Sequence, residues 1–248
     1  MASVHEMDGK QMDLRAVNTA IKGAIEAGSQ VVVRNVGHVH GVAAGLTKGV
    51  VRVKGAVGDY AGALNDGATI TIEGAAGNYV ADNMTAGVVV VDGDAGYCAA
   101  PYGYGGTTII RGSAGDFSAT LNKGGTVVIG KDAGHDVATY MMAGDVVILG
   151  NAGENLANFL IRGAVFVQGK WASLGHNTKV VEITDADAER LAALFKAHGI
   201  QADARTLKKI IPETDKPFYA KSEAAKPGCE AASSAPPAGA KPAGKGVN

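Results

Sequence analysis

The chain of 248 residues carries 23 Lys and Arg against 24 Asp and Glu, which gives a formal net charge of -1 at pH 7. This balance leaves no large basic face and argues against nucleic acid as a partner. No apolar run approaches the roughly 18 residues that span a membrane, and residues 1–7 lack the apolar core of a signal peptide. We therefore expect a soluble cytoplasmic protein that binds neither membranes nor nucleic acid.

Residues 1–30 are expected to form an N-terminal capping segment built on one helix. Asp13 is a candidate N-cap, and Gly28 is a candidate for the residue that follows the helix C-terminus. Between them, apolar residues recur at steps of three and four on one helical face: Leu14, Val17, Ile21 and Ile25. The β-rich run at residues 30–35 then follows as the candidate first strand of the next domain.

A 19-residue repeat dominates the middle of the chain. Its opening glycines stand 19 residues apart: Gly58, Gly77, Gly96, Gly115, Gly134 and Gly153. Each opens a stretch of small and polar residues, followed by a β-rich run and a closing glycine. The β-rich runs are residues 69–73, 88–92, 107–111, 126–129, 145–149 and 164–168. Internal repetition at such a period is typical of solenoid proteins.

One such repeat cannot bury its own apolar face, but stacked repeats can, with each strand pairing in parallel to its neighbours at a spacing of about 4.8 Å. The repeat therefore predicts an all-β fold, a right-handed parallel β-helix formed by a single chain, with about seven coils over residues 31–183 and short capping helices at both ends. An antiparallel sandwich is the alternative, because it also contains many short strands. The regular spacing and the lack of Asn-Gly hairpin turns between the runs favour the β-helix.

After the repeat, residues 184–220 are expected to form a C-terminal helical cap. Thr184 and Asp187 resemble a capping box, and a helical apolar stripe follows and ends at Gly199. A second, shorter helix is predicted over residues 202–211. The last segment, 221–248, is rich in Ala, Pro and Lys and is predicted to be disordered because it has too little apolar surface to fold.

The repeat resembles a known domain. Residues 58–67 read Gly-Asp-Tyr-Ala-Gly-Ala-Leu-Asn-Asp-Gly, and residues 76–93 and 114–130 repeat this pattern. The pattern is similar to the GXGXG domain at the C-terminus of the large subunit of glutamate synthase, over about residues 31–183. The same domain forms one of the subunits of formylmethanofuran dehydrogenase and of the related formyltransferase/hydrolase complex. Residues 169–175 and 216–219 resemble the stand-alone GXGXG subunits of glutamate-synthase-like systems, which include N-methylglutamate synthase.

This resemblance implies a structural and coupling subunit of a hetero-oligomeric oxidoreductase. In the family, the N-terminal nucleophile belongs to an amidotransferase-like subunit, and the flavin and an iron–sulfur cluster belong to an FMN-binding subunit. The GXGXG subunit would bridge the two and have no catalytic residue or cofactor of its own. The corresponding GXGXG subunit of a formylmethanofuran-dehydrogenase-like or formyltransferase/hydrolase complex, with an amidohydrolase-like partner, is the alternative. A free-standing binding solenoid is a third possibility. Whether glutamate or N-methylglutamate is made stays open.

The residues themselves give no catalytic, cofactor or metal site. Cys98 and Cys229 form no Cys-x-x-Cys motif, and no histidine has a partner 19 residues away. Aspartates recur beside glycines, a position where turn capping is more common than metal binding: Asp59, Asp94, Asp116 and Asp132. No phosphate-binding glycine motif occurs.

Departures from the repeat are the candidate partner contacts. Residues 97–106 are the least regular coil and contain Tyr97, Tyr102 and Tyr104. Tyrosine is favoured at interfaces, so these three form a possible interface, and a locally packed bulge is the alternative. In the copy that opens at Gly115 the closing glycine, Gly130, comes one residue early. The methionines at corresponding corners are expected in the core: Met84, Met141 and Met142.

Overall fold

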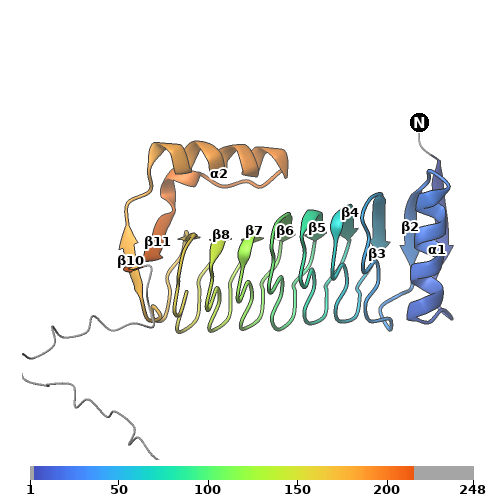
Figure 1. Ribbon diagram of the computed structural model, residues 1–248, viewed down its shortest axis with the longest axis horizontal. Helices are drawn as coiled ribbons and strands as arrows, with labels where there is room; N and C mark the ends of the chain where they lie inside the picture. Colours follow the sequence, from blue (N-terminus) through green and yellow to red (C-terminus); the bar gives the residue numbers. More distant parts are fainter. Residues whose placement is uncertain (1–2, 215–248) are drawn as a thin grey trace, which may run out of the picture. The chain divides into compact units, whose positions relative to one another are not determined.

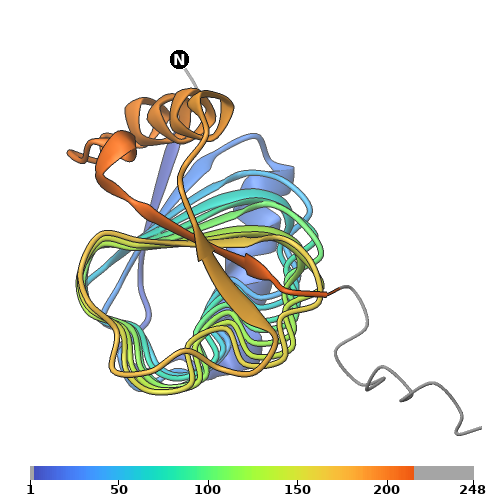
Figure 2. The same ribbon diagram turned by 90° about the vertical axis from the view of Figure 1, so that its left-hand side faces the viewer.

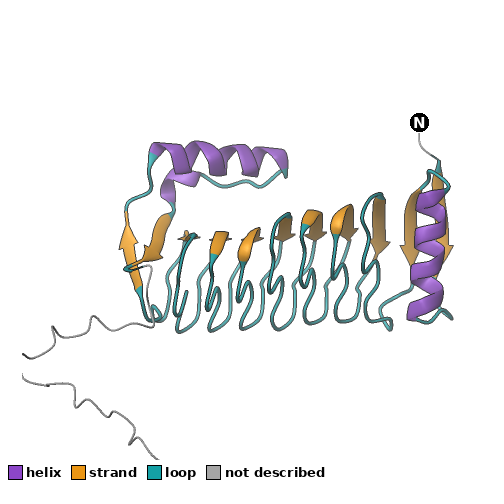
Figure 3. Cartoon of the chain, viewed as in Figure 1, coloured by secondary structure: helices purple, strands orange, loops and turns teal. Residues whose placement is uncertain are grey.

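Nine parallel strands, β1 to β9, stack in chain order and are followed by two antiparallel strands, so that the sheet has 11 strands in the order β1-β2-β3-β4-β5-β6-β7-β8-β9-β11-β10 (Figure 1). The computed structural model describes residues 3–214. The parallel strands are β1 Val4–Asp8, β2 Gln30–Arg34, β3 Val50–Lys54, β4 Asp66–Ile72, β5 Ala86–Val91, β6 Thr107–Ile110, β7 Lys123–Ile129, β8 Ala143–Ile148 and β9 Ala164–Val167. They are joined by loops that form the rest of each coil (Figure 3). The predicted parallel β-solenoid is confirmed, and the antiparallel sandwich is excluded.

The 19-residue period sets the register of the stack. Val51 pairs with Ile70 and Ile70 with Val89, each 19 residues on, and the series continues through β9. Strands β2 to β9 each have at least two buried residues, such as Ile70 and Ile72 in β4. A second column of parallel bridges joins small residues at another corner: Val57, Ala76, Ala95, Ala114, Ala133 and Ala152. Every coil thus places its apolar side chains against those of its neighbours.

The opening glycines are required by the closeness of successive coils. A Cβ atom at Gly58 would lie 2.7 Å from the carbonyl oxygen of Val39, and one at Gly115 would lie 2.8 Å from that of Gly96. None of these six glycines has a left-handed backbone. Their role is therefore to admit the neighbouring backbone, whereas Gly87, at φ +88°, also takes up a left-handed turn.

The stack begins earlier than the sequence indicates. The helix α1 (Leu14–Glu26) forms as predicted, with the Asp13 side chain accepting a hydrogen bond from the amide of Ala16. Its buried face packs into the core at the N-terminal end of the stack (Figure 1). However, β1 precedes it and pairs in parallel with β2. Its sequence, Val-His-Glu-Met-Asp, lacks the alternation of apolar and polar residues that predicts a strand, and its residues are mostly exposed.

The C-terminal segment differs from the predicted helical cap. The helix α2 (Asp185–Ala197) forms with the expected capping box at Thr184, but it lies along the side of the stack. There it packs on the outer faces of β6 to β9 through a second core that includes Val147, Phe166 and Leu191.

The last coil is closed by strands and not by a helix. The predicted second helix is wrong: that segment holds the short 3₁₀ helix η1 (Ala204–Thr206) and then β11 (Lys208–Pro212). Strand β11 pairs with β9 and with β10 (Thr178–Val181), and Figure 2 shows both crossing the end of the stack. The expected disordered tail, 221–248, lies outside the described residues. Within the described part, α1 and α2 are 13 residues each and neither could cross a membrane.

Candidate functional site

The corner of the coils opposite the strands carries exposed aromatic side chains. It is formed by three left-handed residues at alternate positions, for example Tyr60, Gly62 and Leu64. The middle position of each triplet holds a small residue: Ala43, Gly62, Ala81, Ala100, Ala119, Ala138 and Ala157. The first and third positions accept large side chains, and Leu64 is 60% exposed. The repeat therefore presents one or two large side chains per coil at this corner.

The aromatic rings form a continuous ladder over four coils. The Tyr60 and Tyr79 rings stack with centroids 4.8 Å apart and 7° between their planes. Tyr97 meets Tyr79 edge-on at 5.8 Å and contacts Phe117 at 5.6 Å. Burial raises the pKa of Tyr79, and the nearby Cys98 thiol and the other tyrosine hydroxyls add to this.

Tyr97 keeps the ladder continuous where the repeat departs from its pattern. Cys98 occupies the left-handed position that holds Tyr60, Tyr79 and Phe117 in other coils. Its side chain is buried, and burial raises the pKa of its thiol to about 11. A thiol with this pKa is protonated at neutral pH and is a poor nucleophile. The ring of Tyr97, one residue earlier, stands between the rings of Tyr79 and Phe117 instead.

The other two predicted tyrosines lie beside a lysine. The ammonium of Lys123 donates a 2.7 Å hydrogen bond to the hydroxyl of Tyr104 and lies 4.2 Å from the centre of its ring. It also lies 5.8 Å from the centre of the Tyr102 ring. Tyr97, Tyr102 and Tyr104 are 44%, 38% and 55% exposed. Their predicted role as an interface stays a prediction.

We define the aromatic corner surface as six residues: Tyr60, Tyr79, Tyr97, Tyr102, Tyr104 and Phe117. Sequence reasoning missed half of them, Tyr60, Tyr79 and Phe117, because it looked for irregular coils. The signal was present in the repeat itself, since aromatic residues 19 positions apart must stack on each other.

The aspartates beside glycines cap the next coil. The Oδ1 atom of Asp59 accepts a 2.7 Å hydrogen bond from the amide of Asn78, and Asp116 does the same for His135. In the coil between, Asn78 Oδ1 accepts from the amide of Tyr97 at 2.8 Å. These aspartates therefore bond to the next coil, 19 residues on, and not within their own turn, which is what the sequence indicates. In the described residues, no three or more His, Cys, Asp or Glu side chains are placed to hold a metal ion.

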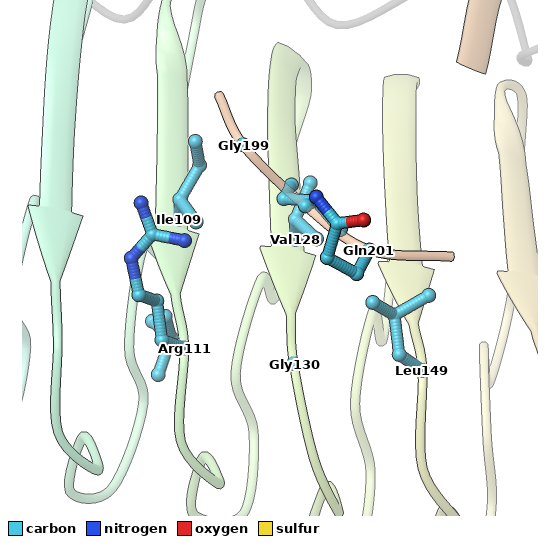
Figure 4. A pocket seen from close by; sticks show the side chains of 9 residues that line it. Ile109, Arg111, Val128, Gly130, Leu149, Gly199 and Gln201 are labelled. Atoms are coloured by element: carbon cyan, nitrogen blue, oxygen red, sulfur yellow. The ribbon is translucent and has the colours of Figure 1, made fainter. Parts of the chain in front are cut away.

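A small pocket of about 180 Å³ lies at Gly130, the early closing glycine of the copy that opens at Gly115 (Figure 4). Gly130 stands where the neighbouring coils carry Arg111 and Leu149, and the loop at Gly199–Gln201 passes over the gap. The Arg111 guanidinium is held by Asp92 at 3.0 Å and donates to the carbonyl of His198 at 3.2 Å. The pocket therefore lies between the stack and the segment that follows α2.

Comparison with known families agrees with the repeat. A family model described as the GXGXG motif matches residues 98–219. No curated protein sequence matches the chain. The match begins later than the resemblance noted from the sequence, and it includes α2 and β11 as well as the coils of β6 to β9. The earlier coils continue the same stack and register. The chain thus carries a GXGXG motif domain, which is consistent with the domain of the glutamate synthase family.

Proposed function

We propose that this chain is a structural and coupling subunit of a glutamate-synthase-type oxidoreductase, in which it bridges an amidotransferase-like subunit and an FMN-binding subunit. The observation that carries the proposal is the GXGXG match over residues 98–219. The flavin and the iron–sulfur cluster belong to the partner subunit in this scheme, and the solenoid provides no catalytic group. The complex makes either glutamate or N-methylglutamate.

The bonding between coils supports a role as a rigid spacer. Backbone groups of one coil bond to the next at several points, for example Tyr60 N to Asn78 O at 2.8 Å and Gly62 N to Val42 O at 2.9 Å. Nine parallel strands at a spacing of about 4.8 Å make a stack about 40 Å long. Two partners bound to such a stack would keep a fixed separation, which is what coupled reactions at two sites require.

The exposed aromatic side chains support binding to another protein. Monomeric proteins rarely expose large clusters of apolar side chains, and such clusters mark interaction sites. Four tyrosines of the aromatic corner surface are at least 38% exposed: Tyr60, Tyr97, Tyr102 and Tyr104. Tyrosine also contributes strongly to binding at protein interfaces.

Co-expression tests the proposal directly. The full chain is produced with an amidotransferase-like subunit and an FMN-binding subunit of the glutamate-synthase-like type, and the mixture is separated by size. We expect one complex that contains all three chains and carries flavin absorbance. The control omits this chain, and the two partners should then elute separately, because the proposal makes it the bridge.

Other outcomes contradict the proposal in different ways. Elution of this chain without the flavoprotein rejects it. Stable assembly with an amidohydrolase-like protein instead would favour the formylmethanofuran-dehydrogenase-like alternative. Product analysis of the assembled complex, supplied with ammonia or methylamine, distinguishes glutamate from N-methylglutamate synthesis.

A further inference from the structure

The aspartates around the aromatic corner surface carry more negative charge than the fold requires. The corner segments of five coils, residues 58–67, 77–86, 96–105, 115–124 and 134–143, contain five aspartates and one lysine. The aspartates are Asp59, Asp66, Asp82, Asp116 and Asp136. Within residues 3–214, none of the five forms an ion pair with a lysine or an arginine; Asp59 lies 3.4 Å from the Nδ1 atom of His40, and Lys123 is bound to Tyr104. This corner therefore has an excess of carboxylates that no lysine or arginine neutralises.

The strand side of the stack is different. There Arg34 pairs with Glu6 at 3.2 Å, Lys54 with Glu73 at 2.6 Å and Arg111 with Asp92 at 3.0 Å. On the strand side, opposite charges of neighbouring coils form ion pairs. At the corner with the tyrosines, no such ion pair with a lysine or an arginine of the described residues forms at the five aspartates.

The hydrogen bond that Asp59 and Asp116 accept from the next coil requires an oxygen atom but not a negative charge. Asn78 and Asn151 accept the same bond from the next coil, at 2.8 and 3.0 Å, that Asp59 and Asp116 accept. Asparagine would therefore serve the fold at Asp59 and Asp116. Within the described residues no lysine or arginine pairs with the charge at these positions, so it can act on something outside the chain.

We propose that the aromatic corner surface binds a protein face that carries arginine side chains. A guanidinium stacks on tyrosine rings and pairs with carboxylates through two parallel hydrogen bonds, so it matches both features of this corner. The surface already holds one cation in this way, since Lys123 lies over the Tyr104 ring. The inference rests on the proposed function in that it takes one of the two partner subunits to supply the arginine-bearing face.

Two double variants separate the aromatic and the charge contributions. Tyr97→Ser with Tyr104→Ser removes two exposed rings at residues whose backbone is not left-handed. Asp59→Asn with Asp116→Asn keeps the capping oxygen and removes two charges. The matched control, Val4→Ser with Val50→Ser, removes two exposed apolar side chains from the strand side. Unfolding midpoints show whether each variant is folded.

Binding of the full chain to the co-expressed partner subunits is measured in low salt and in about 1 M salt, where the Debye length is about 3 Å. We expect the tyrosine variant to raise Kd about tenfold or more, as hot-spot residues do. The aspartate variant should raise Kd about fivefold in low salt and have little effect in high salt. The control should bind as the wild type does. If the wild type binds the partner subunits and both double variants bind them equally well, the inference is overturned, whereas the proposed function still holds.

If the wild type binds neither subunit, the proposed function fails and a peptide of alternating Arg and Gly residues tests the surface by itself. The inference then requires that the wild type bind this peptide more tightly than both double variants, and more tightly than it binds the Lys-Gly equivalent. Absence of peptide binding, or equal binding by wild type and variants, rejects it.

Discussion

Left-handed backbone at residues other than glycine is the main local strain in this fold. Each coil repeats the same triplet at alternate positions, as at Tyr79, Ala81 and Asn83, with φ between +53° and +58°. This conformation costs about 1–2 kcal/mol for most L-residues and less for asparagine. The strain is compensated by the packing and hydrogen bonds of the neighbouring coils. At a position where the native side chain packs little, a residue that tolerates the left-handed conformation should therefore raise the stability of the protein.

Leu64 is such a position, because its φ is +56° and its side chain is 60% exposed. Asn83 and Asn177 already occupy equivalent positions in other coils with similar φ. We expect Leu64→Asn to raise the free energy of unfolding of the isolated chain by about 0.5–1 kcal/mol. Chemical denaturation measures the change.

The same substitution at Leu14 is the matched control. Leu14 is 50% exposed but lies in the first turn of α1, where asparagine is a weaker helix former than leucine. Leu14→Asn should therefore lower stability by about 0.5 kcal/mol. Changes of the same sign at both positions would show that backbone conformation is not the cause.

At the scale of elements, the repeat predicts which strands stack on each other, but it does not predict which segments cover the outside of the stack. The strands and their register follow from the 19-residue period, because stacked coils must align identical positions. The position of α2 did not follow, since its apolar stripe shows that it is buried without showing against what. A signal existed in the sequence of β9, Ala-Val-Phe-Val, in which all four residues are apolar. A strand that is apolar on both faces needs a cover on each.

The candidate site was predicted in part for the same reason. Tyr97, Tyr102 and Tyr104 were found because they interrupt a regular pattern. Tyr60 and Tyr79 obey the pattern and were overlooked, although their rings stack as closely as any in the described residues. Strand β11 was predicted as a helix because its pairing partners, β9 and β10, lie far from it in sequence. Such contacts leave no local periodicity.

Asp187 holds α2 and β11 together and should make stability depend on pH. Its carboxylate accepts hydrogen bonds from Lys209 at 2.6 Å, from Arg190 at 3.2 Å and from Thr184 at 2.7 Å. Burial raises the pKa of this carboxyl, but the hydrogen bonds outweigh burial and hold the pKa well below its usual range. The folded state therefore binds this proton less readily than the unfolded state does. The resulting stability is present above pH about 4 and is lost as pH falls below it.

We expect Asp187→Asn to lower the free energy of unfolding by about 1–3 kcal/mol at pH 7, because it leaves Lys209 and Arg190 without their shared carboxylate. The difference from the wild type should shrink as pH falls below about 4. Asp185→Asn is the control, since Asp185 is 81% exposed in its ion pair with Arg205 and should change stability by about 1 kcal/mol or less. Denaturation at pH 7 and at about pH 3 measures both; an Asp187 effect that does not depend on pH would contradict this account.

For the whole molecule, stability depends on contacts between neighbouring coils. In such a fold each unit contacts only the units on either side, and stability is roughly a sum of their contributions. The hydrogen bonds between coils also join equivalent positions, as in the aspartate and asparagine caps. One complete coil should therefore be removable, provided that the junction brings equivalent positions together.

Deletion of residues 77–95 removes 95 − 77 + 1 = 19 residues, one period, and joins Ala76 to Gly96 in place of Gly77. We expect this variant to fold with the strand content of one coil fewer and to unfold cooperatively at a lower denaturant concentration. Deletion of residues 77–94, one residue shorter, is the matched control. It leaves one residue too many in a single coil, so that this coil must bulge or pair out of register with its neighbours. Circular dichroism and denaturation should show a folded protein for both deletions, with a lower unfolding midpoint for the 18-residue deletion. Equal midpoints would show that the 19-residue register does not determine how well the coils pack.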